Sequence, residues 1–137
     1  MKNTSTDVIL SIKPIYANNI LSGGKRVEFR KKIFKKSVER VYIYSSSPQK
    51  MIIGYFTIKT IVEDTPANLW EKFNDIGGID KDSFFEYFKD ADNGFAIVIN
   101  KVVKFDEEKD PIDFLENFTA PQSYIYLERN TNGLSEF

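Results

Sequence analysis

Apolar and polar residues alternate in several short segments of the chain, as they do in half-buried β-strands. Between residues 25 and 32, Val27 and Phe29 face one way and the charged residues between them face the other. Val41 and Ile43 alternate with tyrosines in the same manner. The pattern predicts strands over 8–12, 25–32, 39–45, 51–63, 95–105 and 123–127.

Three other segments space their apolar residues at helical intervals. Pro14 and Pro66 stand where helices can begin, because proline fixes φ and has no N–H to lose in the first turn. Thr65 precedes Pro66 in the N-cap position. Glycine pairs at Gly23-Gly24 and Gly77-Gly78 follow the first two segments and stop them. The spacing predicts helices over 14–22, 66–76 and 80–90.

The order of these elements is a strand, a helix, three strands, two helices and at least two more strands. It lacks the regular strand–helix–strand alternation of a parallel α/β sheet. We therefore expect an α+β fold: a small bent, mostly antiparallel β-barrel with helices packed at its ends. The length of 137 residues fits one domain over 1–137. A polar tail over 130–137 is expected to fray.

The composition excludes several kinds of chemistry. The chain has no Cys and no His, which removes thiolate nucleophiles, the usual general base and the commonest zinc ligands. The acidic segment 106–111 lacks the spacing of a Ca²⁺ loop and is expected to be a solvated loop. We expect no metal site and no cofactor. No apolar run approaches the length of a membrane span, so a soluble cytoplasmic protein that does not contact membranes is expected.

Charge is unevenly distributed along the chain. Residues 25–40 hold eight basic and two acidic residues, whereas the rest of the chain holds eleven basic and eighteen acidic ones. A basic strip on an otherwise acidic domain favours an anionic partner such as a nucleic acid or nucleotide. A solvated surface loop would give the same composition.

The densest polar cluster lies in the segment from Gly23 to Arg30. Glu28 and Arg30 are two residues apart on a predicted strand and therefore share a face. Alternation alone would place Lys25 on the opposite face, but this residue emerges from a glycine turn that leaves its direction open. From chemistry alone the cluster is either a surface ion pair beside a turn or part of a binding site.

This cluster resembles the signature of ASCH domains, G-x-K-x-x-E-x-R, at Gly23, Lys25, Glu28 and Arg30. Further segments resemble the family in the same order: 10–16 and 20–22 before the motif, and 43–48 and 53–54 after it. The segments 64–66 and 69–70, with 121–123, resemble a prokaryotic subgroup described as predicted transcriptional regulators. The similarity thus extends over nearly the whole chain.

The resemblance implies a fold similar to the RNA-binding PUA domain, with a cleft beside the barrel. It implies that this cleft holds RNA, a nucleotide or a modified nucleoside, with a regulatory role. The ligand-binding residues expected on this basis are Lys13, Lys25, Glu28, Arg30, Ser45 and Gln122. Some members of the family are ribonucleases, and others are amidohydrolases that deacetylate N4-acetylcytidine.

The chain departs from those amidohydrolases at one position. They carry a Thr nucleophile three residues after the motif lysine, where this chain has Glu28. A carboxylate cannot replace a hydroxyl in the same mechanism. If the chain is an enzyme, Glu28 would act as a base and Lys25 as an electrostatic stabiliser in an amidohydrolase or nuclease. Whether it is an enzyme is left open, with binding favoured.

The binding hypothesis assigns further roles. A base could stack on Tyr42, Tyr44 or Tyr124, although a barrel this small needs aromatic residues for its core. A third alternative is a protein-interaction module, with a partner on the Phe-rich helices; packing is the favoured reading of those aromatic residues. Contacts with backbone phosphates, which carry no sequence information, are expected from Lys31, Lys32, Lys35 and Lys36.

Overall fold

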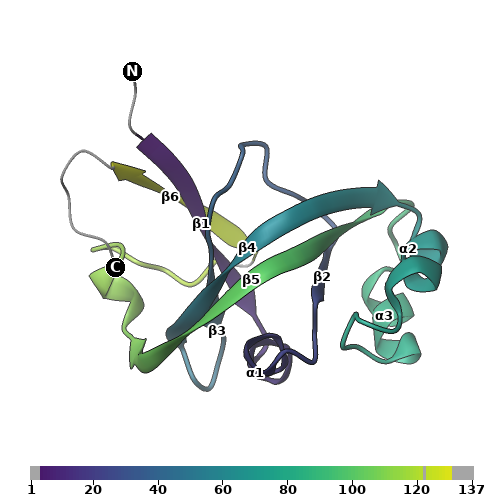
Figure 1. The fold of residues 1–137 in the computed structure, drawn as a ribbon, viewed down its shortest axis with the longest axis horizontal. Coiled ribbons are helices and arrows are strands. Elements are labelled where there is room, and N and C mark those ends of the chain that lie inside the picture. Colours follow the sequence, from purple (N-terminus) through teal and green to yellow (C-terminus); the bar gives the residue numbers. More distant parts are fainter. Residues whose placement is uncertain (1–3, 122, 131–137) are drawn as a thin grey trace.

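In the computed structural model, which describes residues 4–121 and 123–130, a single curved six-stranded sheet forms the centre of the molecule (Figure 1). The strand order is β2-β5-β4-β3-β1-β6. All neighbouring strands are antiparallel except β1 and β3, which are parallel. The predicted α+β fold with a bent, mostly antiparallel sheet is confirmed.

The strands are β1 (Thr4–Ile12), β2 (Val27–Arg30), β3 (Val41–Ser45), β4 (Met51–Asp64), β5 (Gly94–Lys109) and β6 (Tyr124–Asn130). The helices are α1 (Pro14–Ser22), α2 (Pro66–Phe73) and α3 (Lys81–Tyr87), and a short 3₁₀ helix, η1, spans Pro111–Asp113. Six strands and three helices were predicted, and each is present, although β1, β5 and β6 are longer than predicted and β2 and β3 are shorter. The first helix has the predicted bounds, but α2 and α3 are each shorter than predicted.

Both ends of α1 and the start of α2 follow the predicted local signals, but the end of α2 does not. Gly23 ends α1 with a positive φ of 90°, which glycine adopts without strain. The Thr65 side chain accepts a hydrogen bond from the Asn68 N–H and caps α2. Asn74 rather than the glycine pair then ends that helix. The pair Gly77-Gly78 lies in the connection to α3 and has a different role, described below.

The prediction of a loop over 106–111 is wrong for residues 106–109. β5 continues through these charged residues to Lys109, which pairs with Ile52. The side chains of this part of the strand are largely exposed, so a β-strand can carry them without burying charge. At the far end of the strand, the Asp110 side chain caps η1 by accepting from the Ile112 N–H.

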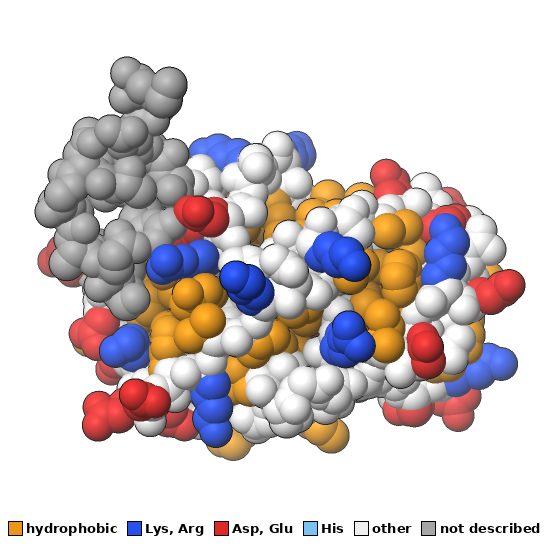
Figure 2. All heavy atoms as spheres, viewed as in Figure 1, with side chains coloured by type: hydrophobic (Ala, Val, Ile, Leu, Met, Phe, Trp, Pro, Cys, Tyr) orange, Lys and Arg blue, Asp and Glu red, His pale blue; other side chains and the backbone are white. Residues whose placement is uncertain are grey.

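β4 and β5 form a long bent pair that crosses the molecule, with α2 and α3 at one end (Figure 1). Gly54 on β4 lies very close to the backbone of β5, because a Cβ there would be 2.4 Å from the carbonyl oxygen of Val103. A side chain at this position would therefore collide with the backbone of β5. Figure 2 views the face on which this pair lies, where basic side chains are scattered between apolar areas.

Three apolar clusters hold these elements together. The alternation of β3 is realised in full: Val41 and Ile43 join the cluster under α1, whereas Tyr42 and Tyr44 join the cluster on the opposite face of the sheet. The third cluster packs β2 against α2 and α3. Tyr42 and Tyr44 are thus core residues, and the suggestion that a base stacks on them is wrong.

The aromatic residues of the Phe-rich helices pack into the core, as predicted. Phe84 and Phe88 are buried, and Trp70, Phe73 and Phe85 are half-buried against them. Little of this cluster is left for a partner. None of the helices in the described part of the chain is long and apolar enough to span a membrane. β6 runs to Asn130, and the remainder of the predicted tail lies outside the described residues.

Candidate functional site

An open pocket with a volume of about 820 Å³ lies between the end of β1, the start of α1, β2 and α3. Lys25, Glu28 and Arg30 all line it, and so does Lys13. Lys31 and Lys32 complete its set of basic side chains, while Glu28 and Glu86 supply its carboxylates. Five cations against two carboxylates make the pocket attractive to anions.

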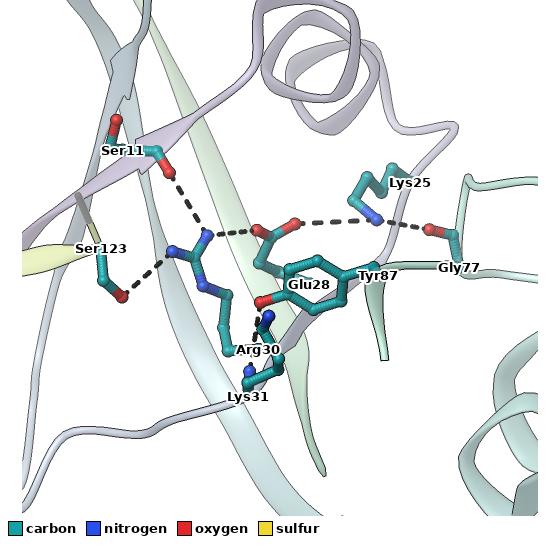
Figure 3. Close-up of polar contacts among 8 residues, drawn as sticks. All are labelled: Ser11, Lys25, Glu28, Arg30, Lys31, Gly77, Tyr87 and Ser123. Carbon is teal, nitrogen blue, oxygen red and sulfur yellow. Dashed lines mark hydrogen bonds and ion pairs between the residues drawn. The ribbon is translucent and has the colours of Figure 1, made fainter. Parts of the chain in front are cut away.

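A chain of ion pairs crosses the floor of this pocket (Figure 3). Glu28 Oε2 accepts a hydrogen bond from Arg30 at 2.9 Å, and Glu28 Oε1 lies 3.7 Å from Lys25 Nζ. The side chains of Lys25 and Glu28 are only 3% and 8% exposed. A buried carboxylate between two cations is paired on both sides and needs no further counter-charge.

Lys25 reaches this site because β2 begins only at Val27. The residue precedes the strand and is not bound to its alternation, so its side chain joins Glu28 rather than the opposite face. Lys25 Nζ also donates to the carbonyl oxygen of Gly77 at 2.6 Å and lies about 5 Å from the ring centres of Tyr16 and Phe29. Burial lowers the pKa of Lys25, and Glu28 opposes this shift.

The Gly77-Gly78 pair makes room for Lys25, a role that the sequence did not reveal. Gly78 has a φ of 62°, and a Cβ at this position would lie 2.5 Å from the Cβ of Lys25. A side chain there would therefore collide with the buried stem of the lysine. The two residues are more than fifty positions apart, so no local pattern could have linked them.

Replacing Gly78 by Ala is expected to destabilise the protein by at least about 2 kcal/mol, because backbone strain and collision with Lys25 add together. Gly23→Ala is the matched control. It also has a positive φ, but a Cβ there meets nothing within 4 Å, so only the strain of about 1–2 kcal/mol is expected. Urea denaturation measures the free energy of unfolding of both variants. Equal losses would contradict the proposed packing of Lys25 against Gly78.

The lowered pKa of Lys25 gives the stability a pH dependence. Between the folded pKa of Lys25 and its ordinary value of 10.5, the unfolded chain binds more protons than the folded protein. Stability from this residue therefore rises as pH increases toward 10.5. We expect the stability difference between wild type and Lys25→Met, measured by urea denaturation, to shift in favour of wild type from pH 8 to pH 10. A difference that is constant over this range would contradict the lowered pKa.

Arg30 connects the edge strand β2 to the opposite side of the curved sheet. Besides Glu28, its guanidinium donates to the carbonyl oxygen of Ser11 at 3.3 Å and to Ser123 Oγ at 3.1 Å (Figure 3). β2 is at one edge of the sheet. Ser11 lies in β1 and Ser123 directly precedes β6, and these two strands are at the other edge. Arg30 thus closes the curled sheet through its side chain and is only partly available to a ligand.

α3 contributes an aromatic wall that the sequence analysis did not assign to the site. Tyr87 lines the pocket and is 37% exposed, and its hydroxyl accepts a hydrogen bond from the Lys31 N–H at 3.1 Å. Lys31 Nζ lies 4.9 Å from the centre of the Tyr87 ring. Burial raises the pKa of the Tyr87 phenol, so the hydroxyl is protonated at neutral pH.

The other predicted site residues are placed differently. Ser45 is buried beside the pocket without lining it, and its Oγ makes no hydrogen bond to any residue that the structure describes. Gln122 lies outside the described residues. Lys35 and Lys36 do not line the pocket, but lie farther along the loop that follows β2. Within the described ranges, no group of three or more acidic side chains is arranged to hold a metal ion.

Comparison with known proteins agrees with this architecture. A family described as a domain of unknown function (DUF365) matches residues 5–125. The ASCH domain-containing ribonuclease of Zymomonas mobilis is 26% identical over 129 residues, which are 90% of this chain and 85% of that protein. The large ribosomal subunit protein uL22 of Ureaplasma parvum is also 26% identical, but the match spans only 41% of its length.

Among solved structures, the crystal structure of ASCH from Zymomonas mobilis superimposes with a TM-score of 0.82 and 26% identity. The match covers 88% of this chain and 87% of that one. It includes the curved sheet and the helices described above. The chain therefore belongs to the DUF365 family, and the ASCH domain predicted from its sequence is confirmed.

Proposed function

We propose that the chain binds single-stranded RNA or a nucleotide, modified nucleosides included, in the pocket around Lys25, Glu28 and Arg30. The observation that carries this proposal is the combination of five cations with a partly exposed tyrosine ring around one open pocket. Cations suit phosphates, and an aromatic ring suits a base. The ribonuclease from Zymomonas, which has the same fold, supports RNA as the ligand.

Each wall of the pocket has a proposed role. Lys13, Lys31 and Lys32 are exposed at its rim and would contact phosphates. Tyr87 would stack on a base, since the residue is 37% exposed and its ring is positioned by the neighbouring Phe88 ring at 4.8 Å. Glu28 would accept from an exocyclic amine. The resemblance to predicted regulators implies a regulatory role. A protein with such a role would bind the ligand without converting it.

The test is fluorescence anisotropy with a labelled single-stranded RNA of about ten nucleotides. Binding should weaken as NaCl is raised, because phosphate contacts release counterions. Arg30→Ala should reduce the affinity by about 1–3 kcal/mol, since it removes a charged donor from the pocket. Circular dichroism of the same sample checks that the variant is folded, because Arg30 also joins β2 to Ser11 and Ser123.

Lys104→Ala is the control for that experiment, because Lys104 is an exposed lysine that does not line the pocket. It should bind RNA as the wild type does. The proposal fails if the wild type binds neither RNA nor any nucleotide, or if a folded Arg30→Ala variant binds with unchanged affinity.

RNA cleavage is a second candidate function, favoured by the name of the Zymomonas relative. In that case Glu28 would take a proton from the 2′-hydroxyl, whose oxygen attacks the adjacent phosphorus. The P–O5′ bond breaks, a 2′,3′-cyclic phosphate forms and water protonates the leaving 5′-oxygen, while Lys25 and Arg30 would stabilise charge on the phosphate. Electrophoresis of end-labelled RNA distinguishes the candidates. Cleavage that is lost in both Lys25→Met and Glu28→Gln would support catalysis, whereas intact RNA in the bound state would support binding alone. Deacetylation of N4-acetylcytidine through a Thr nucleophile is not expected, since Glu28 stands in that position, and an amidohydrolase would have to use Glu28 as a base toward water.

A further inference from the structure

The pocket continues into a basic surface formed by the loop after β2 and by the first residues of β6. Residues 29–38 contain no carboxylate, and all four of their lysines are exposed. The first two, Lys31 and Lys32, line the pocket, and the second two, Lys35 and Lys36, lie beyond it. A fully extended chain would place Lys31 and Lys36 at most about 18 Å apart, and the bends of this loop bring them closer than that.

Successive residues of the loop contact successive residues of β6, at increasing distance along the chain from the pocket. Arg30 bonds to Ser123, the Phe34 ring packs edge-on against Tyr124 at 5.1 Å, and the N–H groups of Lys35 and Lys36 both donate to the Tyr126 hydroxyl. The two segments therefore run side by side, starting at the pocket. Tyr126 holds the middle of this loop, which runs from residue 31 to residue 40, through its hydroxyl.

Two of the lysines on this surface are held in place by tyrosine rings. Lys31 Nζ lies 4.9 Å from the centre of the Tyr87 ring at the pocket, and Lys36 Nζ lies 4.9 Å from the centre of the Tyr126 ring beyond it. Ordered cations lose less conformational freedom when they contact a ligand than freely moving ones do. Both rings of Tyr124 and Tyr126 are only half-buried and present part of their surface beside the lysines.

We infer that this surface is a track for the backbone of a single-stranded nucleic acid whose terminal or flipped nucleotide occupies the pocket. The inference rests on the proposed function and deepens it, because it selects an extended strand over a free nucleotide. The pocket accounts for one nucleotide, and Lys35, Lys36 and Tyr126 contact the nucleotides that follow. The arrangement reads phosphates and base faces, so it is tolerant of sequence.

The experiment compares a nucleoside monophosphate with single-stranded oligonucleotides of increasing length, using calorimetry or anisotropy. Wild-type affinity should rise with length until the track is filled and then stay constant. The double variant Lys35→Ala/Lys36→Ala should lower affinity for the longer strand by about 10- to 30-fold at 0.1 M salt. It should also reduce the salt slope by about 1.4, the value for two phosphate contacts on a single strand. Mononucleotide binding should not change.

Two further variants make the test specific. Tyr126→Phe keeps the ring but removes the hydroxyl that holds the loop, so it should weaken binding of the long strand and leave the monophosphate unaffected. Lys101→Ala/Lys104→Ala removes the same charge from exposed positions on β5 outside the pocket and should change neither. A DNA strand of the same sequence shows whether the track requires the 2′-hydroxyl.

The outcomes separate the two proposals. If the monophosphate binds but affinity does not increase with length, the track is refuted and the pocket stands. If both double variants weaken long-strand binding equally, the effect is one of overall charge and the track is refuted. If neither mononucleotides nor strands bind, the proposed function fails as well.

Discussion

Replacing Glu28 by Gln is expected to lower the free energy of unfolding by about 3 kcal/mol at pH 7, because the change leaves the Lys25 ammonium buried without its counter-charge. Glutamine keeps an oxygen that can accept from Arg30, so the variant isolates the loss of charge. Urea denaturation followed by circular dichroism measures the effect. Lys72→Ala, which breaks an exposed ion pair with Asp64, is the control and should change stability little.

Two additional measurements identify Lys25 as the cause. The loss in Glu28→Gln should shrink as pH rises toward 10.5, since a neutral amine no longer needs the carboxylate. The double variant Lys25→Met/Glu28→Gln should be more stable than the sum of the single changes predicts. Strict additivity, or a loss below about 1 kcal/mol in Glu28→Gln, would show that the buried ion pair does not contribute as described.

Replacing Phe84 by Ala is expected to cost about 3–5 kcal/mol, the usual range for a buried phenylalanine in a packed core. The ring is fully buried, and the rings of Phe29, Trp70, Phe85 and Phe88 all lie about 5 Å from it. The change would leave a cavity between β2 and the helices α2 and α3. Thermal and urea denaturation measure the loss.

The same variant tests how the helices support the site. Phe84 also lines the pocket, and Tyr87 lies one turn farther along α3. Hydrogen exchange of α2 and α3 should therefore increase more than that of β1 and β3, which pack in another cluster. Ile112→Ala, at a residue that is 57% exposed, is the control and should have little effect. Uniform exchange throughout the molecule would contradict separate packing of this cluster.

Much of the local structure was predictable because it is encoded by neighbouring residues. The bounds of α1 follow from Pro14 and Gly23, and the two faces of β3 follow from alternation. The charged end of β5 was missed, because a strand exposed on both sides lacks the alternation by which strands are recognised. η1 was missed for a related reason, since a single turn is too short to show a period.

For the candidate site, the motif identified Lys25, Glu28 and Arg30 as a group before any geometry was known, and all three line the pocket. The sequence did not indicate Tyr87 of α3, nor Ser11 and Ser123, which accept hydrogen bonds from Arg30. Ser11 takes part through its backbone carbonyl, which gives no signal in the side-chain pattern. Tyr87 belongs to an aromatic helix whose other rings face the core, so composition did not distinguish it from them.

The sequence by itself determined the presence and order of the six strands and of α1, α2 and α3, and the charged cluster at β2, because caps, glycine turns and periodicity act over a few residues. Only the tertiary structure decided which strands are neighbours, including the parallel pairing of β1 with β3. It also decided where Lys25 points, since Gly77 and Gly78 come from a distant connection, and what Arg30 joins, since Ser123 lies 93 residues away. These contacts depend on the closure of the curved sheet, which is set by packing of the whole chain and leaves no periodic trace in it.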